Sequence, residues 1–191
     1  MKLFSRYLTI AVIIGTIITI GSCKSKKPIS VLETGEVEIS FPCFGSDFQS
    51  TKTMIRATAV GESMDQQMAN RMARSAALED LGTKIRTSIN SVIEDYYISR
   101  NQNMTEDLRQ RFQGQTDIVV KERVSGYKVI CERFTRDTQT RNYKCYIAIE
   151  ISTDAISQTA HQRLTDDQML RIDYDYERFR EKFNEAIEKA R

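Results

Sequence analysis

The chain has 191 residues, of which 40% are hydrophobic and 28% charged, with 2 prolines and 8 glycines. This composition excludes a collagenous or low-complexity protein and predicts one folded domain. There are 28 Lys and Arg against 26 Asp and Glu. Because residues 1–22 contain Lys2 and Arg6 but no acid, the rest of the chain is electrically neutral, which argues against electrostatic capture of nucleic acid.

Residues 1–22 have the features of a secretory signal peptide. After two basic residues, the uncharged run 7–20 is shorter than the about 20 residues that span a bilayer. The sequence IGSC at residues 20–23 then resembles a bacterial lipobox, in which small residues precede the cysteine that becomes lipidated. We therefore predict a lipoprotein signal peptide over 1–22 and a lipidated N-terminus at Cys23. An ordinary signal peptide or a short membrane anchor is the alternative.

Residues 23–34 are predicted to form a flexible tether after the lipidated Cys23, because they hold three Lys and no aromatic residue. Two or three acyl chains, each contributing about 0.8 kcal/mol per buried methylene, would hold Cys23 stably in the membrane. Lys24, rather than an Asp, follows Cys23, which favours the outer membrane. The tether also lacks the acidic cluster that resembles a surface-export signal. We expect an outer-membrane lipoprotein whose domain, residues 35–191, faces the periplasm, with the cell surface as the alternative.

The domain is predicted to begin with a strand and a long helix. Residues 54–60 alternate well enough to be a strand, and Gly61 ends it. Ser63 and Gln66 then have the spacing of a capping box. An apolar stripe is expected to face the sheet and consists of Met68, Met72, Ala76, Leu81, Ile85, Ile89, Val92 and Tyr96, with Ala69, Ala73 and Ala77 beside them.

The middle of the chain is predicted to supply most of the strands. The polar segment 99–115 is expected to be a loop with one short helix around Leu108 and Phe112. Three strand-like runs follow at residues 118–124, 127–134 and 143–151. Residues 135–142 are expected to turn the second of these runs into the third. The sheet would then have about four mostly antiparallel strands.

After a helix over 154–164, the most regular pattern in the chain predicts a C-terminal amphipathic helix over 165–190. Thr165 and Gln168 have a second capping-box spacing. Apolar residues follow in alternating steps of three and four: Met169, Ile172, Tyr176, Phe179, Phe183, Ala186 and Ala190. Packing on its own domain is favoured over an intermolecular coiled coil, because two-stranded coils prefer Leu, Ile and Val to aromatic residues. The first five of these residues are the candidates for an interaction helix.

The sequence offers little for catalysis. His161 is the single histidine and has no Cys, Asp or Glu at metal-ligand spacing, so a zinc site or a Ser-His-Asp site is hard to assemble. We predict an exposed histidine on a helix. A run of acids, Asp166, Asp167, Asp173 and Asp175, lacks the pattern of a calcium-binding loop and is expected to be a solvated helix face. We therefore expect no cofactor, no metal and no catalytic residue.

An alternative function of a different class uses carboxylates and aromatic rings. The 26 Asp and Glu offer many pairs of the kind that glycoside hydrolases use, and no motif selects one of them. Exposed tyrosines would stack on sugar rings, with Tyr96, Tyr97, Tyr174 and Tyr176 as candidates. The chain would then bind or hydrolyse carbohydrate or peptidoglycan.

Cys43, Cys131 and Cys145 can form one disulfide in an oxidising envelope. A hairpin centred on Thr138 would place Cys131 opposite Cys145, but opposed Cβ atoms lie about 4.5–5.5 Å apart, wider than the about 3.8 Å of a relaxed disulfide. A bridge from Cys43 to Cys131 would instead pin the segment before the first strand, and its long loop would contribute about 4–5 kcal/mol at most. Three reduced, buried thiols are the third alternative.

Three segments carry a family resemblance: IRATAVGES at 55–63, MANRMARSAALEDLGTKI at 68–85 and YKCYIAIEI at 143–151. They resemble the lipoprotein-twenty (LPP-twenty) family, which is related to the N-terminal domain of the flagellar assembly protein T. The resemblance implies an α+β domain of the cell envelope with no shared reaction, so no catalytic residue carries over.

A second set of residues resembles a group of Bacteroidetes-type lipoproteins. These have a Pro-Cys before the first strand and an Ile-Cys-Glu in a later one, here Pro42-Cys43 and Ile130-Cys131-Glu132. This resemblance implies a disulfide between Cys43 and Cys131.

Taken together, the sequence predicts an α+β domain in which a long helix and the C-terminal helix cover one face of the sheet. The expected function is that of a non-catalytic, lipid-anchored envelope protein, a protein-interaction or structural module. Its expected partners are the membrane, through the lipid on Cys23, and an envelope protein or a second copy of itself.

Overall fold

The computed structural model describes residues 39–170 and 172–189. The expectations for the signal peptide, for Cys23 and for the tether therefore lie outside the described residues. The described helices and strands belong to one compact unit, Ser40–Arg191. They follow in the order η1 (Ser46–Phe48), β1 (Met54–Ser63), α2 (Gln66–Ser99), α3 (Glu106–Arg123), η2 (Val124–Gly126), β2 (Lys128–Arg136), β3 (Tyr143–Ser152), α4 (Thr153–Asp166) and α5 (Tyr176–Lys189). The α+β class predicted from the sequence is confirmed.

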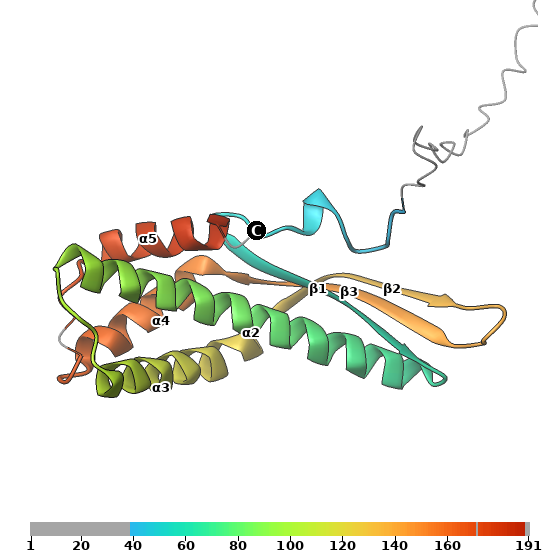
Figure 1. Cartoon of the computed structure of the whole chain (residues 1–191). Helices are drawn as coiled ribbons and strands as arrows, with labels where there is room; N and C mark the ends of the chain where they lie inside the picture. The colour runs from blue at the N-terminus through green and yellow to red at the C-terminus, as the bar shows by residue number, and fades with distance from the viewer. Residues whose placement is uncertain (1–38, 171, 190–191) are drawn as a thin grey trace, which may run out of the picture. The chain divides into compact units, whose positions relative to one another are not determined.

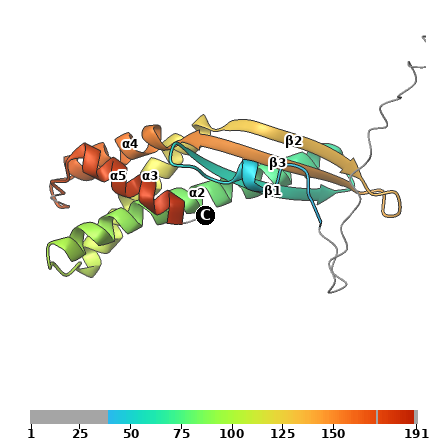
Figure 2. The ribbon, with the colours of Figure 1, turned by 90° about the horizontal axis from the view of Figure 1, so that it is seen from above.

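The sheet has three strands in the order β1-β3-β2, and both neighbouring pairs are antiparallel. Figure 1 shows α2 running along one face of this sheet, and Figure 2 shows β3 between the two edge strands. The side chains that β1 and β3 bury on the α2 face are Ile55, Ala57, Cys145, Ile147, Ile149 and Ile151. Their strict alternation along each strand is the pattern that predicted these two strands.

The expectation of a fourth strand at 118–124 is wrong, because this run is the end of α3 and η2. The Thr105 hydroxyl accepts a hydrogen bond from the N–H of Leu108 and caps the helix. Acidic residues occupy the first turn of α3 and basic residues the last, which suits the helix dipole. The helix also buries one stripe of side chains: Phe112, Thr116, Val119 and Val120. This burial outweighs the β-propensity of the run.

The first half of α2 lies unusually close to β1. Ala69, Ala73 and Ala77 form the contact side of the helix and are fully buried. Opposite them is Gly61, where an added Cβ atom would lie 2.2 Å from the Ala69 carbonyl oxygen. The backbones of helix and strand can approach this far only because Gly61 has no side chain.

The predicted α2 stripe is therefore partly wrong. Met68 and Met72 are 43% and 48% exposed, and Ala76 is exposed as well, because the alanines beside them face the sheet instead. The capping-box prediction is also wrong in detail. Asp65, rather than Ser63, caps α2, and its carboxylate accepts a hydrogen bond from the Met68 N–H at 2.7 Å.

The opposite face of the sheet is covered by the segment that precedes β1. Cys43 packs with Tyr146 and Ala148 of β3, and Phe48 and Cys131 lie against them. Phe41 stacks on Tyr146 with ring centroids 6.2 Å apart. This segment thus forms a small second layer, so side chains pack on both faces of β3.

A disulfide joins Cys43 to Cys131, with Cα atoms 5.5 Å apart. This is the pair implied by the resemblance to the Bacteroidetes-type lipoproteins. The register that would bring Cys131 opposite Cys145 is wrong, because the turn between β2 and β3 places Phe134 opposite Cys145. Cys145 is a buried free thiol on the α2 face.

A β-bulge in β2 decides which face its side chains meet. Val129 pairs with Ile149 and Cys131 pairs with Ala148, so Ile130 is an extra residue. Because side chains alternate between the two faces, one inserted residue moves every later side chain to the other face. Cys131 therefore meets Cys43, while Glu132 turns towards α2. There its carboxylate accepts hydrogen bonds from Asn70 and Arg74 at 2.7 and 2.8 Å.

The C-terminal part begins as predicted, with α4 following β3 directly, but α5 begins at Tyr176 rather than at Thr165. The Asp175 carboxylate accepts hydrogen bonds from the N–H groups of Glu177 and Arg178 and so caps the start of α5. α5 packs on α2 and α4, as Figure 2 shows for α4. Its buried side chains are Phe179, Phe183 and Ile187.

The prediction that Met169, Ile172, Tyr176, Phe179 and Phe183 form an interaction helix is therefore wrong. Of its five residues, Ile172, Phe179 and Phe183 are buried in the domain's own core. Tyr176 is half-buried, and Met169 is exposed on the turn before α5. α5 instead packs on its own domain, which is the alternative that the sequence favoured.

We predict that Gly61→Ala lowers the free energy of unfolding by about 2–4 kcal/mol, because the new methyl group would overlap the backbone of α2. Urea denaturation of the purified chain measures this effect. Gly114→Ala is the matched control, since a Cβ on this exposed residue of α3 meets nothing within 4 Å. Gly114→Ala is expected to raise the free energy of unfolding by about 0.5–1 kcal/mol. Equal effects at both sites would contradict the close helix–strand contact.

We also predict that the double variant Cys43→Ala, Cys131→Ala loses about 2–4 kcal/mol of stability, because the disulfide closes a loop across 88 residues of the unfolded chain. Denaturation with and without a reductant measures this loss. The reductant should destabilise the wild-type chain and leave the double variant unchanged. A wild-type chain indifferent to the reductant would disprove the stabilising role.

Candidate functional site

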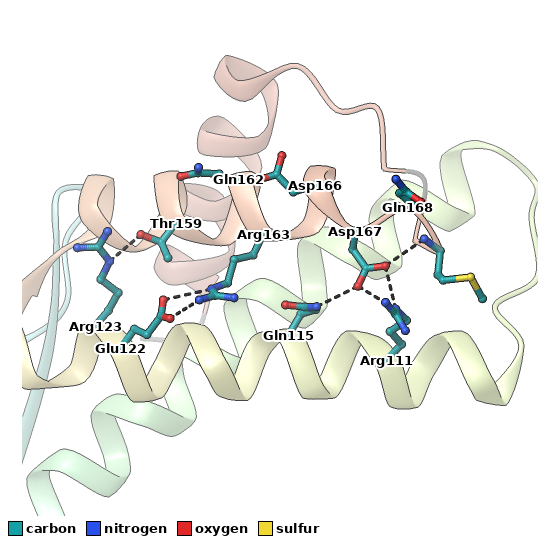
Figure 3. A pocket seen from close by; sticks show the side chains of 11 residues that line it. Arg111, Gln115, Glu122, Arg123, Thr159, Gln162, Arg163, Asp166, Asp167 and Gln168 are labelled. Carbon is teal, nitrogen blue, oxygen red and sulfur yellow. Dashed lines mark hydrogen bonds and ion pairs between the residues drawn. The ribbon is translucent and has the colours of Figure 1, made fainter.

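The α3–α4 groove is an open polar hollow of about 720 Å³ between two helices. Figure 3 shows side chains from α3, from α4 and from the turn after α4 pointing into it. Its lining residues are Arg111, Gln115, Glu122, Arg123, Thr159, Gln162, Arg163, Asp166, Asp167, Gln168 and Met169. Residues three, four or seven apart on each helix share one side, which is why these positions gather in one groove.

Asp167 is the most enclosed charged group of the groove, with 7% of the residue exposed. Arg111 Nε donates to both carboxylate oxygens at 2.8 Å, and Gln115 Nε2 donates to one of them at 2.9 Å. The N–H of Met169 donates to the same carboxylate at 3.0 Å. Asp167 therefore fastens the turn after α4 to the side of α3.

The pKa of Asp167 reflects this arrangement. Burial by itself would raise the pKa, but hydrogen bonds from Arg111, the Met169 N–H and Gln115 outweigh it and hold the pKa below its usual range. A carboxylate with a lowered pKa is a weak base at neutral pH and holds no proton to give. Asp167 thus acts as a structural anion, and its assignment to a solvated helix face is wrong.

Three other charged side chains of the groove, Glu122, Arg123 and Arg163, also have partners within it. Arg163 forms an ion pair with Glu122, and Arg123 Nε donates to the Thr159 hydroxyl at 2.6 Å. These contacts join α3 to α4, and the dashed lines of Figure 3 trace them. The groove is therefore a polar helix–helix contact whose outer part is open to a ligand.

Two other acids of the predicted run, Asp173 and Asp175, also have structural roles, and Asp166 is exposed as expected. Asp173 accepts a hydrogen bond from the Tyr96 hydroxyl at 2.6 Å and is paired with Arg100. These two partners hold the pKa of Asp173 below its usual range, while burial raises the pKa of Tyr96. The Asp173–Tyr96 contact joins the end of α2 to the segment before α5.

The expectation of exposed tyrosines is wrong. Tyr96, Tyr97 and Tyr174 are buried, and Tyr176 is half-buried. The rings of Tyr96 and Tyr174 meet edge to face at 4.7 Å. These tyrosines are core residues and supply no stacking platform for a sugar.

His161 is also less exposed than predicted. Its Nε2 lies 2.7 Å from the Tyr174 carbonyl oxygen, and its ring packs against Tyr176 and Phe179. The histidine thus helps to hold α5 on α4. Within residues 39–170 and 172–189, no group of three or more His, Cys, Asp or Glu side chains is placed to hold a metal ion.

A second surface feature follows the free edge of β1. We call it the β1-edge strip and define it by Met64, Met68, Met72 and Ala76, all of them exposed. Val60 of β1 is exposed as well, but its side chain points to the opposite face of the sheet, as that of its partner Tyr146 does. The Met72 Cβ would lie 3.0 Å from a Cβ on Gly61, which places this side of α2 beside β1. The strip is apolar over two turns of helix.

The sequence held a signal for this strip. The chain carries two apolar series four residues apart, one of Met68, Met72 and Ala76 and one of Ala69, Ala73 and Ala77. Periodicity alone predicts that both series belong to one stripe that faces the sheet. Gly61, which is predicted to end the first strand but lies within β1, marks the small series as the contact side and leaves the methionines for the surface.

Comparisons with protein-family models, curated proteins and solved structures found no match to this chain. The resemblance to the lipoprotein-twenty family stays a prediction that rests on the three segments named above. Among the described residues, no helix has the length and apolar character needed to span a membrane.

We predict that Asp167→Asn destabilises the chain by about 1–3 kcal/mol at neutral pH, because the buried charge-assisted hydrogen bonds weaken. The folded-state pKa of Asp167 lies below its unfolded value. Its contribution is therefore complete above the unfolded pKa and is lost as the pH falls through the folded pKa. The difference between variant and wild type should shrink below about pH 4, as thermal unfolding at several pH values measures.

Asp117→Asn is the control for this prediction. Asp117 pairs with Arg86 on the surface, where both side chains are well exposed. Removing this ion pair should lower the free energy of unfolding by less than about 1 kcal/mol. An Asp167→Asn effect as small as that of Asp117→Asn would refute the anchoring role of Asp167.

Proposed function

We propose that the protein is a non-catalytic, lipid-anchored protein of the bacterial cell envelope that works by binding proteins. The observation that carries the binding role is the β1-edge strip. Three exposed methionines, Met64, Met68 and Met72, follow one another beside an open strand edge, and grouped apolar side chains on a protein surface mark interaction sites. Methionine suits such a surface because its flexible side chain adapts to a partner.

The anchor rests on the lipobox sequence that ends at Cys23. Lys24 supports the outer membrane as the location, and the lack of acids directly after the cysteine supports the periplasmic face. The tether would let the domain reach partners away from the membrane.

The non-catalytic part rests on how the polar groups of the α3–α4 groove are used. Its most buried carboxylate is held ionised by Arg111, and its ion pair between Glu122 and Arg163 links the two helices. Groups committed to such contacts are poorly placed to exchange protons with a substrate.

A second candidate function uses the same groove for binding a carbohydrate or a peptidoglycan fragment. The observation in its favour is the open polar lining, which includes Gln162, Asp166 and Gln168. Amide and carboxylate groups hydrogen-bond to sugar hydroxyls. Peptidoglycan fragments that bind the wild-type chain, but not an Arg123→Ala variant, would favour this function over the first.

We predict that the full chain carrying a photo-crosslinking residue in place of Met68 is found in the membrane fraction and gives a covalent protein adduct on irradiation of intact cells. The same residue in place of Gln113, exposed on α3, should give none. Fractionation, labelling with palmitate and gel analysis measure these outcomes.

Cys23→Ser is the control for the anchor and should abolish both palmitate labelling and membrane association. Equal adducts from Met68 and Gln113 would reject the binding surface. Membrane association that survives Cys23→Ser would reject the lipid anchor.

A further inference from the structure

We propose that the β1-edge strip is a two-fold interface at which two copies of this chain join their sheets edge to edge. This deepens the proposed function and rests on it, since it names the partner as a second copy.

The backbone of β1 presents open hydrogen-bonding groups. The N–H of Arg56 donates to Ser50 Oγ at 3.0 Å, and its carbonyl oxygen accepts from Lys84 Nζ at 2.9 Å, so both groups point away from β3. In an antiparallel strand, every second residue points its backbone groups the same way. Thr58, Val60 and Glu62 therefore present their N–H and C=O groups at the free edge.

The two edges of the sheet differ in their protection. β2, the other edge strand, carries Lys128, Arg133 and Arg136 and is distorted by the bulge at Ile130. Charges and bulges of this kind are devices that block pairing between edges. β1 pairs with β3 without a register shift from Met54 to Ser63, and it has no Lys or Pro. It is the edge that remains suited to adding a strand.

The methionines lie where an added strand would cover them. Met72 is beside Gly61 on the outer side of α2, and Met68 is one turn away on the same side. A strand paired with β1 would extend the sheet beneath this side of the helix. A second copy would bring its own α2, so that the exposed methionines of the two helices would face one another across the axis.

The positions of the open backbone groups select one register. An axis through Val60 pairs Thr58 with Glu62 of the second copy and uses all three open residues. An axis through Glu62, whose carboxylate is already paired with Lys144, would match Val60 with Met64 and Thr58 with Gln66, and both of these partners lie outside β1. An axis through Thr58 would require the backbone groups of Arg56, which Ser50 and Lys84 already engage. The edge is therefore complementary to itself around Val60.

The size of this contact predicts a weak dimer in solution. Three residues of edge and two turns of helix bury less than the about 1,600 Å² of a standard interface. Two copies held on the same membrane would meet at a much higher effective concentration. The test therefore uses the full chain in its membrane.

The experiment places a cysteine on the axis. We expect Val60→Cys, treated in membranes with a short bis-thiol crosslinker, to give a covalent dimer of the chain. Thr135→Cys, exposed on β2, is the matched control and should stay monomeric. The native cysteines interfere little, because the sulfur of Cys23 carries the proposed lipid, Cys43 is bonded to Cys131 and Cys145 is buried. No dimer from Val60→Cys, or equal yields from both variants, overturns the proposal.

A second pair of variants tests the same interface by measuring the yield of adduct from the photo-crosslinking residue in place of Met68. Val60→Lys would oppose two cations at the axis and should reduce the adduct of twice the chain mass at least tenfold, while Val60→Thr should keep it. Thermal unfolding checks that both variants fold. An adduct with a different protein that survives Val60→Lys, with no double-mass adduct, overturns the dimer and leaves the proposed function standing. The absence of any adduct from Met68 in the chain that keeps Val60 overturns both the dimer and the proposed function.

Discussion

The close contact between Gly61 and the alanine side of α2 is the constraint on which the rest of the domain depends. It fixes the height of the helix above the sheet and its rotation about its own axis. With Ala69, Ala73 and Ala77 turned inward, Met68 and Met72 are left beside the open edge of β1. The second half of α2 then presents larger residues, from Leu81 to Tyr96, to the sheet end and to α3 and α5. One small residue in a strand thus determines both the core and the exposed apolar surface.

The bulge at Ile130 is the second local feature with long-range effects. By moving Cys131 to one face and Glu132 to the other, it lets β2 hold a layer on each side of the sheet. On one side the disulfide holds the segment around Cys43, and on the other Arg74 and Asn70 of α2 hold Glu132. β2 buries little apolar surface of its own, so these two attachments compensate for a thin core at that edge.

Much of the fold could be predicted from the sequence, because residues 143–151 alternate strictly and residues 66–99 keep a helical period. The predictions that the structure contradicts have one physical cause. Periodicity shows which residues share one side of a helix or strand, but it does not show which element packs against that side. The run at 118–124 has the β-branched residues of a strand, but burial against α2 and α4 makes it helical. The regular pattern from Met169 to Ala190 crosses a turn, because Asp175 caps a new helix there. At the α3–α4 groove, nothing in the sequence distinguishes the buried Asp167 from its exposed neighbour Asp166, since only the fold brings Arg111 to one of them.

The disulfide also decides how the domain would carry a mechanical load. A pull on the chain from the N-terminal side reaches Cys43 first and passes through the sulfur atoms into the middle of β2. The whole segment between the two cysteines, which includes β1, α2 and α3, is bypassed by this covalent route. The load then enters the sheet along a strand held by hydrogen bonds over much of its length, instead of peeling the chain away from its first residue. A domain tied to a membrane by its N-terminus would thereby keep its long helix and its open strand edge intact under tension.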